Sequence, residues 1–344
     1  MGEEIIISII KLLIFFFAMF TAAAYTTLAE RKIMSYMQLR KGPNRAGPWG
    51  FLQPLADGIK FIFKEEIVPA HTDSKMFILG PILVIAVSLM PWVALPFGDT
   101  ITLFGREIYM QLADINTGAL FMISISSLGV YGIILGGWAS NNKFSLLGSV
   151  RSAAQMISYE LPLGLSLAAI FILSGSLGTR DIVLSQIASP WQWNIFVQPV
   201  GFIIFFTSIL AETNRTPFDL AECDSELLAG YHTEYGGFKF SLFLFGEYIN
   251  IITASAFMAV LYLGGWSIPF VNLHDLGLSP NVIGVISIIV VLAKTCFFVF
   301  LFIWVRWTLP RFRYDQLMDL GWKVLLPLSI VNLMITAAAV LFTK

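Results

Sequence analysis

Six carboxylates and one arginine are concentrated in residues 211–235, AETNRTPFDLAECDSELLAGYHTEY, of a chain that is otherwise mostly apolar. The acids are Glu212, Asp219, Glu222, Asp224, Glu226 and Glu234, and the arginine is Arg215. If residues 218–228 are helical, Asp219, Glu222 and Glu226 share one face, where like charges titrate as a coupled set. A solvated acidic loop would also explain these charges, but the apolar residues among them predict that part of the segment is buried.

Two more acids stand inside apolar stretches, Glu160 in RSAAQMISYELPLGL and Glu247 in SLFLFGEYINI. An ionised carboxylate in the middle of a membrane costs about 2.5–3.5 kcal/mol or more, so we expect each to be protonated, hydrated or paired. Pro162 lacks a backbone donor and is expected to loosen the helix beside Glu160. Pairing with Arg151 or Lys294 for helix packing is the alternative to proton exchange.

These acids suggest a path for protons. We hypothesise a line from Glu234 and Glu226 through Glu212 to Glu247 and Glu160, from one membrane face to its middle.

A third feature is the segment 304–323, WVRWTLPRFRYDQLMDLGWK, in which Arg306, Arg311 and Arg313 alternate with aromatic residues. These arginines either only set the membrane topology or contact the acidic segment or an anionic partner surface. The three histidines have no metal-ligand spacing, and we assign no metal site.

The elements that position these residues are expected to be membrane spans. Hydrophobic residues make up 57% of the 344 and charged residues 12%, against about 25% charged in soluble domains. Stretches of about 20 apolar residues can cross a membrane. Eight are found, at residues 5–29, 76–97, 115–139, 152–174, 195–211, 240–266, 281–305 and 322–343, of which the fifth is the weakest. The sequence therefore predicts an all-α integral membrane protein, one membrane domain over 1–344, with a long acidic loop at 212–239.

Lysine and arginine fall mostly on one side of this topology. The loops 30–75, 139–151, 212–239 and 306–323 hold sixteen of them, and the opposite side holds three. This asymmetry places the odd loops in the cytoplasm or its equivalent, with both termini on the outer side. Residues 51–66, FLQPLADGIKFIFKEE, have one polar and one apolar helical face, which predicts an amphipathic helix lying in the interface. It serves either as an anchor or as a wall beside an opening to the lipid.

Motifs for cofactors are missing from the sequence. Cys223 and Cys296 form no CxxC pair, and neither a GxGxxG after a strand-like run nor a GxxxxGK[ST] motif occurs. The sequence thus predicts no iron–sulfur, zinc or nucleotide site in this chain, and its composition gives no sign of nucleic-acid binding.

Several long motifs resemble one family. These are AERKIMSYMQLRKGPNRAGPWGFLQPLADGIKFIFKEE (29–66), RSAAQMISYE (151–160), LAETNRTPFDLAE…SEL…G…EY (210–235), GEYINI of the sixth span and PRFRYDQLM (310–318). In matching order over most of the chain, they resemble the eight-helix membrane subunit that forms the quinone chamber of proton-pumping NADH:quinone oxidoreductase, respiratory complex I. The resemblance implies a chamber through which a quinone's tail enters from the lipid, and an acidic funnel that couples quinone reduction to proton pumping.

The resemblance also implies roles for individual residues. Glu30, Arg31, Arg40, Asp57, Arg306 and Arg311 would line the quinone chamber. Glu160, Glu212, Arg215, Asp219, Glu222, Asp224, Glu226, Glu234 and Glu247 would form the proton-coupling funnel. No residue of this chain would be catalytic in its own right. Cys223 and Asp224 replace an expected glycine and glutamate, and the Leu161–Pro162 pair is atypical, which weakens the transfer of roles at those positions.

Quinone would be the substrate, whereas flavin and iron–sulfur clusters would be held only by partner subunits. The implied partners are hydrophilic-arm subunits carrying the terminal iron–sulfur cluster, antiporter-like membrane subunits, and membrane lipid. The protein would reside in an energy-transducing membrane, bacterial or organellar. Three alternatives stay open from the residues: the equivalent subunit of a membrane-bound hydrogenase-type complex, a stand-alone proton or ion antiporter, and a scaffold that only anchors the hydrophilic arm.

Overall fold

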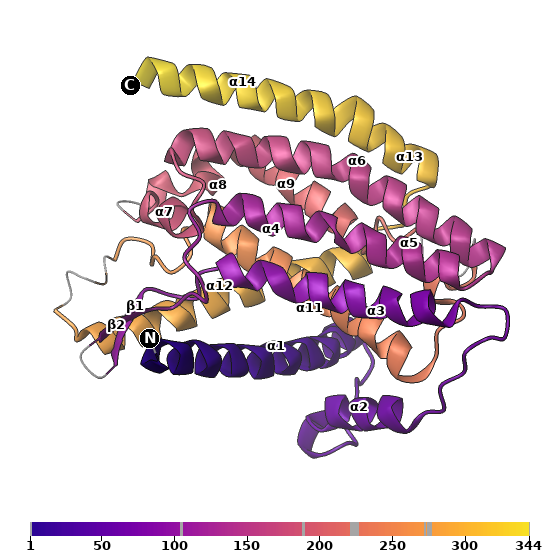
Figure 1. Ribbon diagram of the computed structural model, residues 1–344. Helices are drawn as coiled ribbons and strands as arrows, with labels where there is room; N and C mark the ends of the chain where they lie inside the picture. Colours follow the sequence, from indigo (N-terminus) through magenta and orange to yellow (C-terminus); the bar gives the residue numbers. More distant parts are fainter. Residues whose placement is uncertain are drawn as a thin grey trace.

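The computed structural model describes residues 2–103, 106–187, 190–220, 227–271, 273 and 277–343. Long helices lie side by side and make up most of the molecule (Figure 1). They are α1 (Gly2–Met37), α3 (Ser74–Leu89), α4 (Gly118–Ser127), α5 (Gly129–Ala139), α6 (Lys143–Ser174), α9 (Pro199–Glu212), α11 (Gly237–Tyr262), α12 (Pro280–Thr308) and α14 (Leu326–Thr343). The expectation of an all-α membrane protein is met in outline.

Shorter elements connect the long helices. They are the helices α2 (Gln53–Phe63), α7 (Thr179–Leu184), α8 (Asn194–Val197) and α13 (Tyr314–Asp319), the 3₁₀ turns Pro48–Gly50, Met90–Ala94, Pro190–Gln192 and Gly230–His232, and a π-helical stretch Leu320–Leu325 that joins α13 to α14. Two strands, β1 (Thr100–Leu103) and β2 (Arg106–Tyr109), pair antiparallel. This small hairpin departs from the all-α expectation, and the Asn281 side chain at the start of α12 binds it at Thr102.

Within the described part of the chain, seven helical stretches are long and apolar enough to cross a membrane. The predicted fifth span, 195–211, falls instead on α9, which has 14 residues. At about 1.5 Å per residue such a helix covers roughly 21 Å, short of the roughly 30 Å of a hydrocarbon core. It starts at Pro199, whose missing N–H is tolerated in a first turn, directly after the separate turn of α8.

Two helices extend beyond the predicted apolar spans. Helix α1 continues past residue 29 to Met37, so Glu30 and Arg31 lie on its last turns. Helix α6 begins at Lys143 rather than at 152, because the Asn142 side chain accepts a hydrogen bond from the Phe144 N–H and caps the helix. Hydropathy finds the apolar part of a helix, whereas capping decides where the backbone pattern ends.

Helix α11 is the centre of the bundle. All residues from Ile251 to Tyr262 are buried, and α1, α3 and α12 pack around it. Its polar residues therefore face other helices, not lipid, which is the setting that an intramembrane carboxylate requires.

Helix α2 stands beside the bundle, at the end opposite to the two termini and the β1–β2 hairpin (Figure 1). It lies within the predicted amphipathic segment 51–66, and Leu55, Ile59 and Ile62 on its apolar face are exposed. Only a lipid or protein surface would cover such a face.

Close contact between helices α5 and α6 depends on a glycine. A Cβ built on Gly137 would lie 2.8 Å from the Ser145 carbonyl oxygen and 2.3 Å from Ser149 Oγ, so an alanine there must push the helices apart. Gly164, in the middle of α6, has open space at the same position.

We expect Gly137→Ala to lower the free energy of unfolding by about 1–3 kcal/mol, as overpacking does in other cores. Gly164→Ala is the matched control, and it should be neutral or slightly stabilising because alanine favours helix. Thermal denaturation of the purified protein in detergent measures both. Equal stability of the two variants would contradict the tight α5–α6 contact.

Candidate functional site

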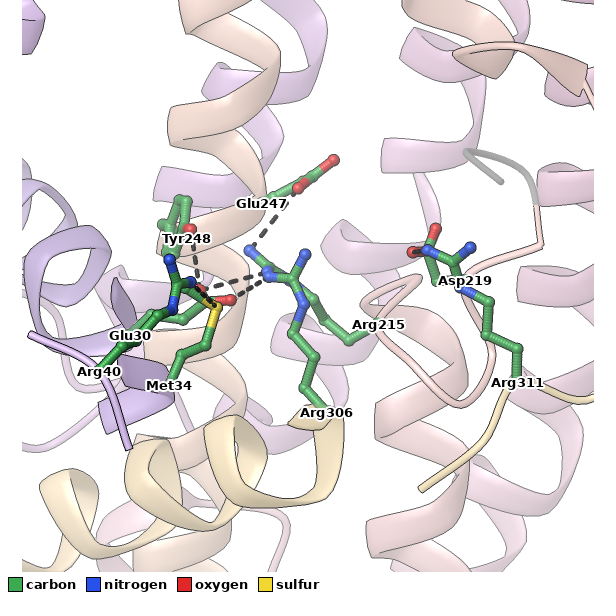
Figure 2. A network of polar contacts seen from close by, with 9 residues as sticks. All are labelled: Glu30, Met34, Arg40, Arg215, Asp219, Glu247, Tyr248, Arg306 and Arg311. Carbon is green, nitrogen blue, oxygen red and sulfur yellow. Dashed lines mark hydrogen bonds and ion pairs between the residues drawn. The ribbon is translucent and has the colours of Figure 1, made fainter. Parts of the chain in front are cut away.

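Glu30, near the C-terminal end of α1, is a buried carboxylate with three partners. Its Oε2 accepts hydrogen bonds from the Tyr248 hydroxyl at 2.8 Å and from Arg215 Nη1 at 3.4 Å. Its Oε1 accepts from Arg306 Nη1 at the end of α12. Figure 2 shows these groups converging on Glu30 from separate segments. Glu30 and Arg306, which were expected in the quinone chamber, thus meet Arg215, which was expected in the proton-coupling funnel.

Arg215 connects this cluster to Glu247. Its guanidinium lies over the Tyr248 ring, 4.6 Å from the centroid, and its Nη2 lies 3.7 Å from Glu247 Oε2. Burial, the largest influence, lowers the pKa of Arg215, but attraction to Glu30 and Glu247 outweighs it and raises the pKa. The guanidinium is therefore a permanent positive charge between two carboxylates.

The loop that carries Arg215 is held by a buried amide. Gln155 Nε2 on α6 lies within hydrogen-bonding distance of three oxygens: the Ala211 carbonyl at 2.8 Å, the Phe218 carbonyl at 2.9 Å and Asn214 Oδ1 at 3.2 Å. Asn214 itself has a φ of +49°, which turns the chain sharply after α9. Buried backbone oxygens need such donors, so Gln155 fixes the direction in which the loop leaves the helix.

Asp219 forms a second ion pair, beside the Glu30 cluster (Figure 2). Arg311 Nη2 donates to its Oδ2 at 3.1 Å. Burial raises the pKa of the Asp219 carboxyl from 3.8 to about 6, while the attraction of Arg311 opposes the rise. Glu247 also acts on this carboxyl electrostatically and raises its pKa further. Asp219 is therefore a group whose charge changes close to neutral pH.

Glu160 and Glu212 both lie near the break between α4 and α5. Ser127 lies near Glu160, and Ser126 lies near Glu212. The two carboxyls are close enough to interact electrostatically. Both serine hydroxyls donate to the Ile123 carbonyl, at 2.9 and 3.0 Å.

Helix α6 runs unbroken across Pro162, so the expected loosening does not interrupt the helix next to Glu160. The alternative in which Glu160 pairs with Lys294 is also excluded, because the three donors of Lys294 go to backbone carbonyls. These are the carbonyls of Leu263, Gly265 and Ser267, at 2.5, 2.8 and 2.6 Å. Arg151 stacks over the Tyr314 ring, with 5.6 Å to its centroid.

A cavity of about 70 Å³ inside the bundle is lined by two of the acids, Glu212 and Glu247. A buried water needs roughly 10–15 Å³ by a similar measure and several polar partners, so several waters fit. Its polar lining consists of Ser126, Glu212, Thr213, Asn214, Tyr231, Glu247, Asn250 and Thr253. Glu212 and Glu247 therefore share one hydratable space, with Ser126 at the α4–α5 break.

Two of the six residues assigned to a quinone chamber, Arg31 and Asp57, line a smaller cavity between α1, α2 and α11. Arg31 Nη1 donates to Asp57 Oδ2 at 2.7 Å, and Gln53 Nε2 donates to Asp57 Oδ1 at 3.1 Å, which ties α2 to α1. Arg31 and Asp57 line this cavity together with Tyr248, one of the partners of Glu30. The cavity is therefore next to the Glu30 cluster.

The remaining assigned residues are less central. The Arg40 guanidinium contacts the Gln38 side chain at 2.8 Å and Met34 Sδ at 3.6 Å. Glu234 accepts from Asn142 Nδ2 at 2.7 Å, which connects it to the cap of α6 instead of to Glu247. Glu222, Asp224 and Glu226 lie outside the described residues, as does Cys223.

Sequence reasoning did not assign roles to Tyr231, Tyr248, Gln155 and Asn250. A signal existed for the two amides, because an amide in an apolar span must be hydrogen-bonded or line a hydrated space. Nothing local distinguishes the two tyrosines from ordinary core aromatics. Among the described residues, no three His, Cys, Asp or Glu side chains are grouped so as to hold a metal ion.

Comparison with known proteins defines the class. Helices long enough to span a membrane, with paired carboxylates and a polar cavity between them, are typical of a membrane protein that handles ions or protons. A family model described as NADH dehydrogenase matches residues 10–337. The NADH-quinone oxidoreductase H subunit 1 of Cytophaga hutchinsonii is 50% identical over 93% of this chain and 92% of its own.

Other relatives agree with this match. The NADH-quinone oxidoreductase H subunit of Leptospira biflexa is 51% identical over 97% of this chain and 95% of its own. The corresponding protein of Geobacter metallireducens is 50% identical over 97% and 96%. The chain belongs to the NADH dehydrogenase family of membrane subunits that includes the H subunit of complex I, and the resemblance of its motifs is confirmed.

The titration of Asp219 leads to a prediction on stability. Because its pKa in the folded protein lies above the ordinary value, the folded state binds this proton more tightly than the unfolded chain does. The stabilising effect is present in full below pH 3.8 and is lost as the pH rises through about 6.

We therefore expect the wild type to lose about 1 kcal/mol of stability between about pH 5 and about pH 7 that Asp219→Asn does not lose. Thermal denaturation at both pH values measures this difference. Asp315→Asn, which removes an exposed acid paired with Arg313, is the control and should keep the wild-type pH dependence. An Asp219→Asn variant with an unchanged pH dependence would show that another group titrates in this range.

Proposed function

We propose that this chain is the membrane subunit of a proton-translocating NADH:quinone oxidoreductase that forms the quinone chamber and couples quinone reduction to proton pumping. The observation that carries the proposal is the continuous series Glu30–Arg215–Glu247, which begins beside the α1–α2–α11 cavity and ends in the hydratable cavity that Glu247 shares with Glu212. Charge formed at one end of this series alters the groups at its other end.

The chemistry of quinone reduction explains why such a series is useful. Reduction takes up two electrons and two protons, and negative charge develops where the electrons arrive before the protons do. An anion near Arg306 and Arg215 competes with Glu30 for their hydrogen bonds, because guanidinium groups bind anions strongly in a buried setting. A weakened hold of Arg215 on Glu247 then changes the tendency of Glu247 to bind a proton.

The quinone's tail would enter from the lipid between α1, α2 and α11. The exposed apolar face of α2, which includes Ile59 and Ile62, suits a helix lying in the membrane interface. The Arg31–Asp57 ion pair braces α2 against α1 at this opening. Arg40 and Arg311 would complete the polar end of the chamber, near the subunits that deliver electrons.

The proton path would use Glu212 and Glu160 after Glu247. The serines at the α4–α5 break would then pass protons toward the neighbouring antiporter-like membrane subunits. Glu222, Asp224, Glu226 and Glu234 would supply protons from the acidic loop, and Arg215 and Asp219 would tune it. Flavin and iron–sulfur clusters would be in partner subunits of the hydrophilic arm, and this chain would hold only the quinone.

The arrangement of the helices supports a sidedness for the chain. We infer eight crossings, with the short helix α9 as the fifth. An even number of crossings places both termini on one side, and Figure 1 shows them at the same end of the bundle, with the β1–β2 hairpin. The excess of lysine and arginine in the odd loops makes that side the outer one, in an energy-transducing membrane.

The first test removes the proton-binding capacity of the acids without changing their shape. We expect Glu247→Gln and Glu212→Gln, each in the assembled complex, to lower coupled turnover by at least about tenfold, because a positioned proton donor or acceptor contributes roughly 100- to 10,000-fold. NADH-driven quinone reduction and proton uptake into proteoliposomes measure both activities.

Asp319→Asn is the control for this test, because Asp319 forms an exposed ion pair with Lys323 and should be dispensable. Full turnover and pumping in both glutamine variants, with normal assembly, would favour a scaffold role. A preparation that evolves hydrogen and lacks flavin would favour the hydrogenase-type relative.

The second test concerns the opening at α2. Asp57→Asn breaks the ion pair with Arg31, which is partly exposed and so contributes no more than about 1 kcal/mol. We expect it to raise the KM for a long-tailed quinone by about two- to fivefold. The KM for a tailless quinone should change less, because only the tail has to pass α2.

Glu66→Gln serves as the matched control, since it breaks the ion pair with Lys239 on the same side of the protein without lining the cavity. Steady-state kinetics of the two quinones in each variant provide the comparison. An equal KM change for both quinones would place Asp57 away from the path of the tail.

A further inference from the structure

The Glu247 carboxylate interacts with Tyr231 through one oxygen and with Arg215 through the other. The Tyr231 hydroxyl donates to its Oε1 at 3.2 Å. Arg215 Nη2 lies 3.7 Å from its Oε2, which is longer than a hydrogen bond. The carboxylate therefore stops short of a close ion pair with the arginine, although nothing in the charges themselves prevents one.

Tyr231 is fixed rigidly enough to hold a carboxylate in this orientation. It lies in the 3₁₀ turn Gly230–His232, where the φ of +58° at Gly230 turns the chain. Its backbone carbonyl accepts a hydrogen bond from the Ser145 hydroxyl at 3.0 Å. Its ring is 2% exposed and packs edge-on against Phe243, with 5.4 Å between centroids. The hydroxyl is thus placed from both the backbone and the ring.

Tyr231 and Glu247 also line the same cavity, which reaches Glu212. A carboxylate turned fully toward Arg215 would be locked in an ion pair, and a carboxylate in the cavity exchanges protons with water. The observed orientation lies between these two states, and the Tyr231 hydroxyl is a group that maintains it.

We propose that Tyr231 is a positioning residue for proton movement, whose hydroxyl keeps Glu247 between Arg215 and the cavity. This inference rests on the proposed function and adds to it a residue that acts through Glu247. Other charges acting there are Glu212 in the same cavity, Asp219, which interacts electrostatically with Glu247, and Glu30 through Arg215. Without the hydroxyl, Glu247 moves into a close pair with Arg215 and exchanges protons more slowly.

Tyr231→Phe tests this directly, because it removes one oxygen and leaves the ring packing unchanged. In the assembled complex in proteoliposomes, we expect coupled turnover and proton uptake to fall by roughly two- to tenfold, the effect of losing one hydrogen bond. In the infrared difference spectrum on quinone reduction, we expect the carboxyl band that Glu247→Gln abolishes to shift in Tyr231→Phe.

Tyr235→Phe is the matched control. Tyr235 is a buried tyrosine of the same segment, but its hydroxyl contacts the carbonyls of Phe77 and Gly136 at 3.1 and 3.4 Å. Its loss should leave the infrared band at the wild-type position, whatever its effect on stability. A band shift in Tyr235→Phe equal to that in Tyr231→Phe would overturn the proposal, since it would indicate a general packing effect.

The outcomes separate this inference from the proposed function. Wild-type turnover and an unshifted band in Tyr231→Phe, with Glu247→Gln inactive, would overturn the role of Tyr231 and leave the function of Glu247 intact. Full activity of Glu247→Gln itself would overturn both. Reduced turnover with a shifted band in Tyr231→Phe alone supports the positioning role.

Discussion

A carboxylate buried in an apolar bundle has to be compensated, and the site depends on how Glu30 meets this requirement. Taking an ion out of water costs several kcal/mol, which only close and well-directed partners repay. Arg215, Arg306 and Tyr248 supply them from the loop after α9, the end of α12 and the middle of α11. The packing of these elements against α1 is therefore coupled to a single charged group, and a ligand that disturbs this group acts on all of them.

From Glu30 to Glu247 the ion-pair distance to Arg215 grows from 3.4 to 3.7 Å. Glu30 is in direct contact with two arginines, whereas Glu247 lies 3.7 Å from the nearer of them and Glu212 faces a cavity. A tightly paired carboxylate keeps its charge, and a loosely paired or hydrated one changes it at small cost. Under the proposed function, this difference would let a movement of charge near Glu30 change the protonation of groups further inside. A uniform series of strong pairs would only stabilise the fold.

The sequence predicted the long helices and the amphipathic segment at α2 because both depend on local periodicity and hydropathy. It also singled out Glu160 and Glu247, since acids in apolar stretches need a special environment, and Glu212 as part of the acidic segment. It did not predict that Glu160 and Glu212 both lie near the α4–α5 break, nor that Gln155 holds the Arg215 loop, because these arrangements join segments far apart in the chain. The hypothesised line from Glu234 is likewise a three-dimensional statement, and Glu234 contacts Asn142 at the α6 cap.

Complete satisfaction of hydrogen bonds separates buried charges that stabilise the fold from those that take part in chemistry. Lys294 has three donors and three carbonyl acceptors within 2.8 Å, so any movement would cost hydrogen bonds, and it fixes the loop after α11. Glu160 Oε1 and Asp219 Oδ1 are buried atoms without a hydrogen-bond partner among the described residues. An unused acceptor on a carboxylate is a place where a proton or a water binds without displacing anything. Asp219 lies beside Arg311, and Glu160 lies near Glu212, so a change of protonation at either has charged neighbours to act on.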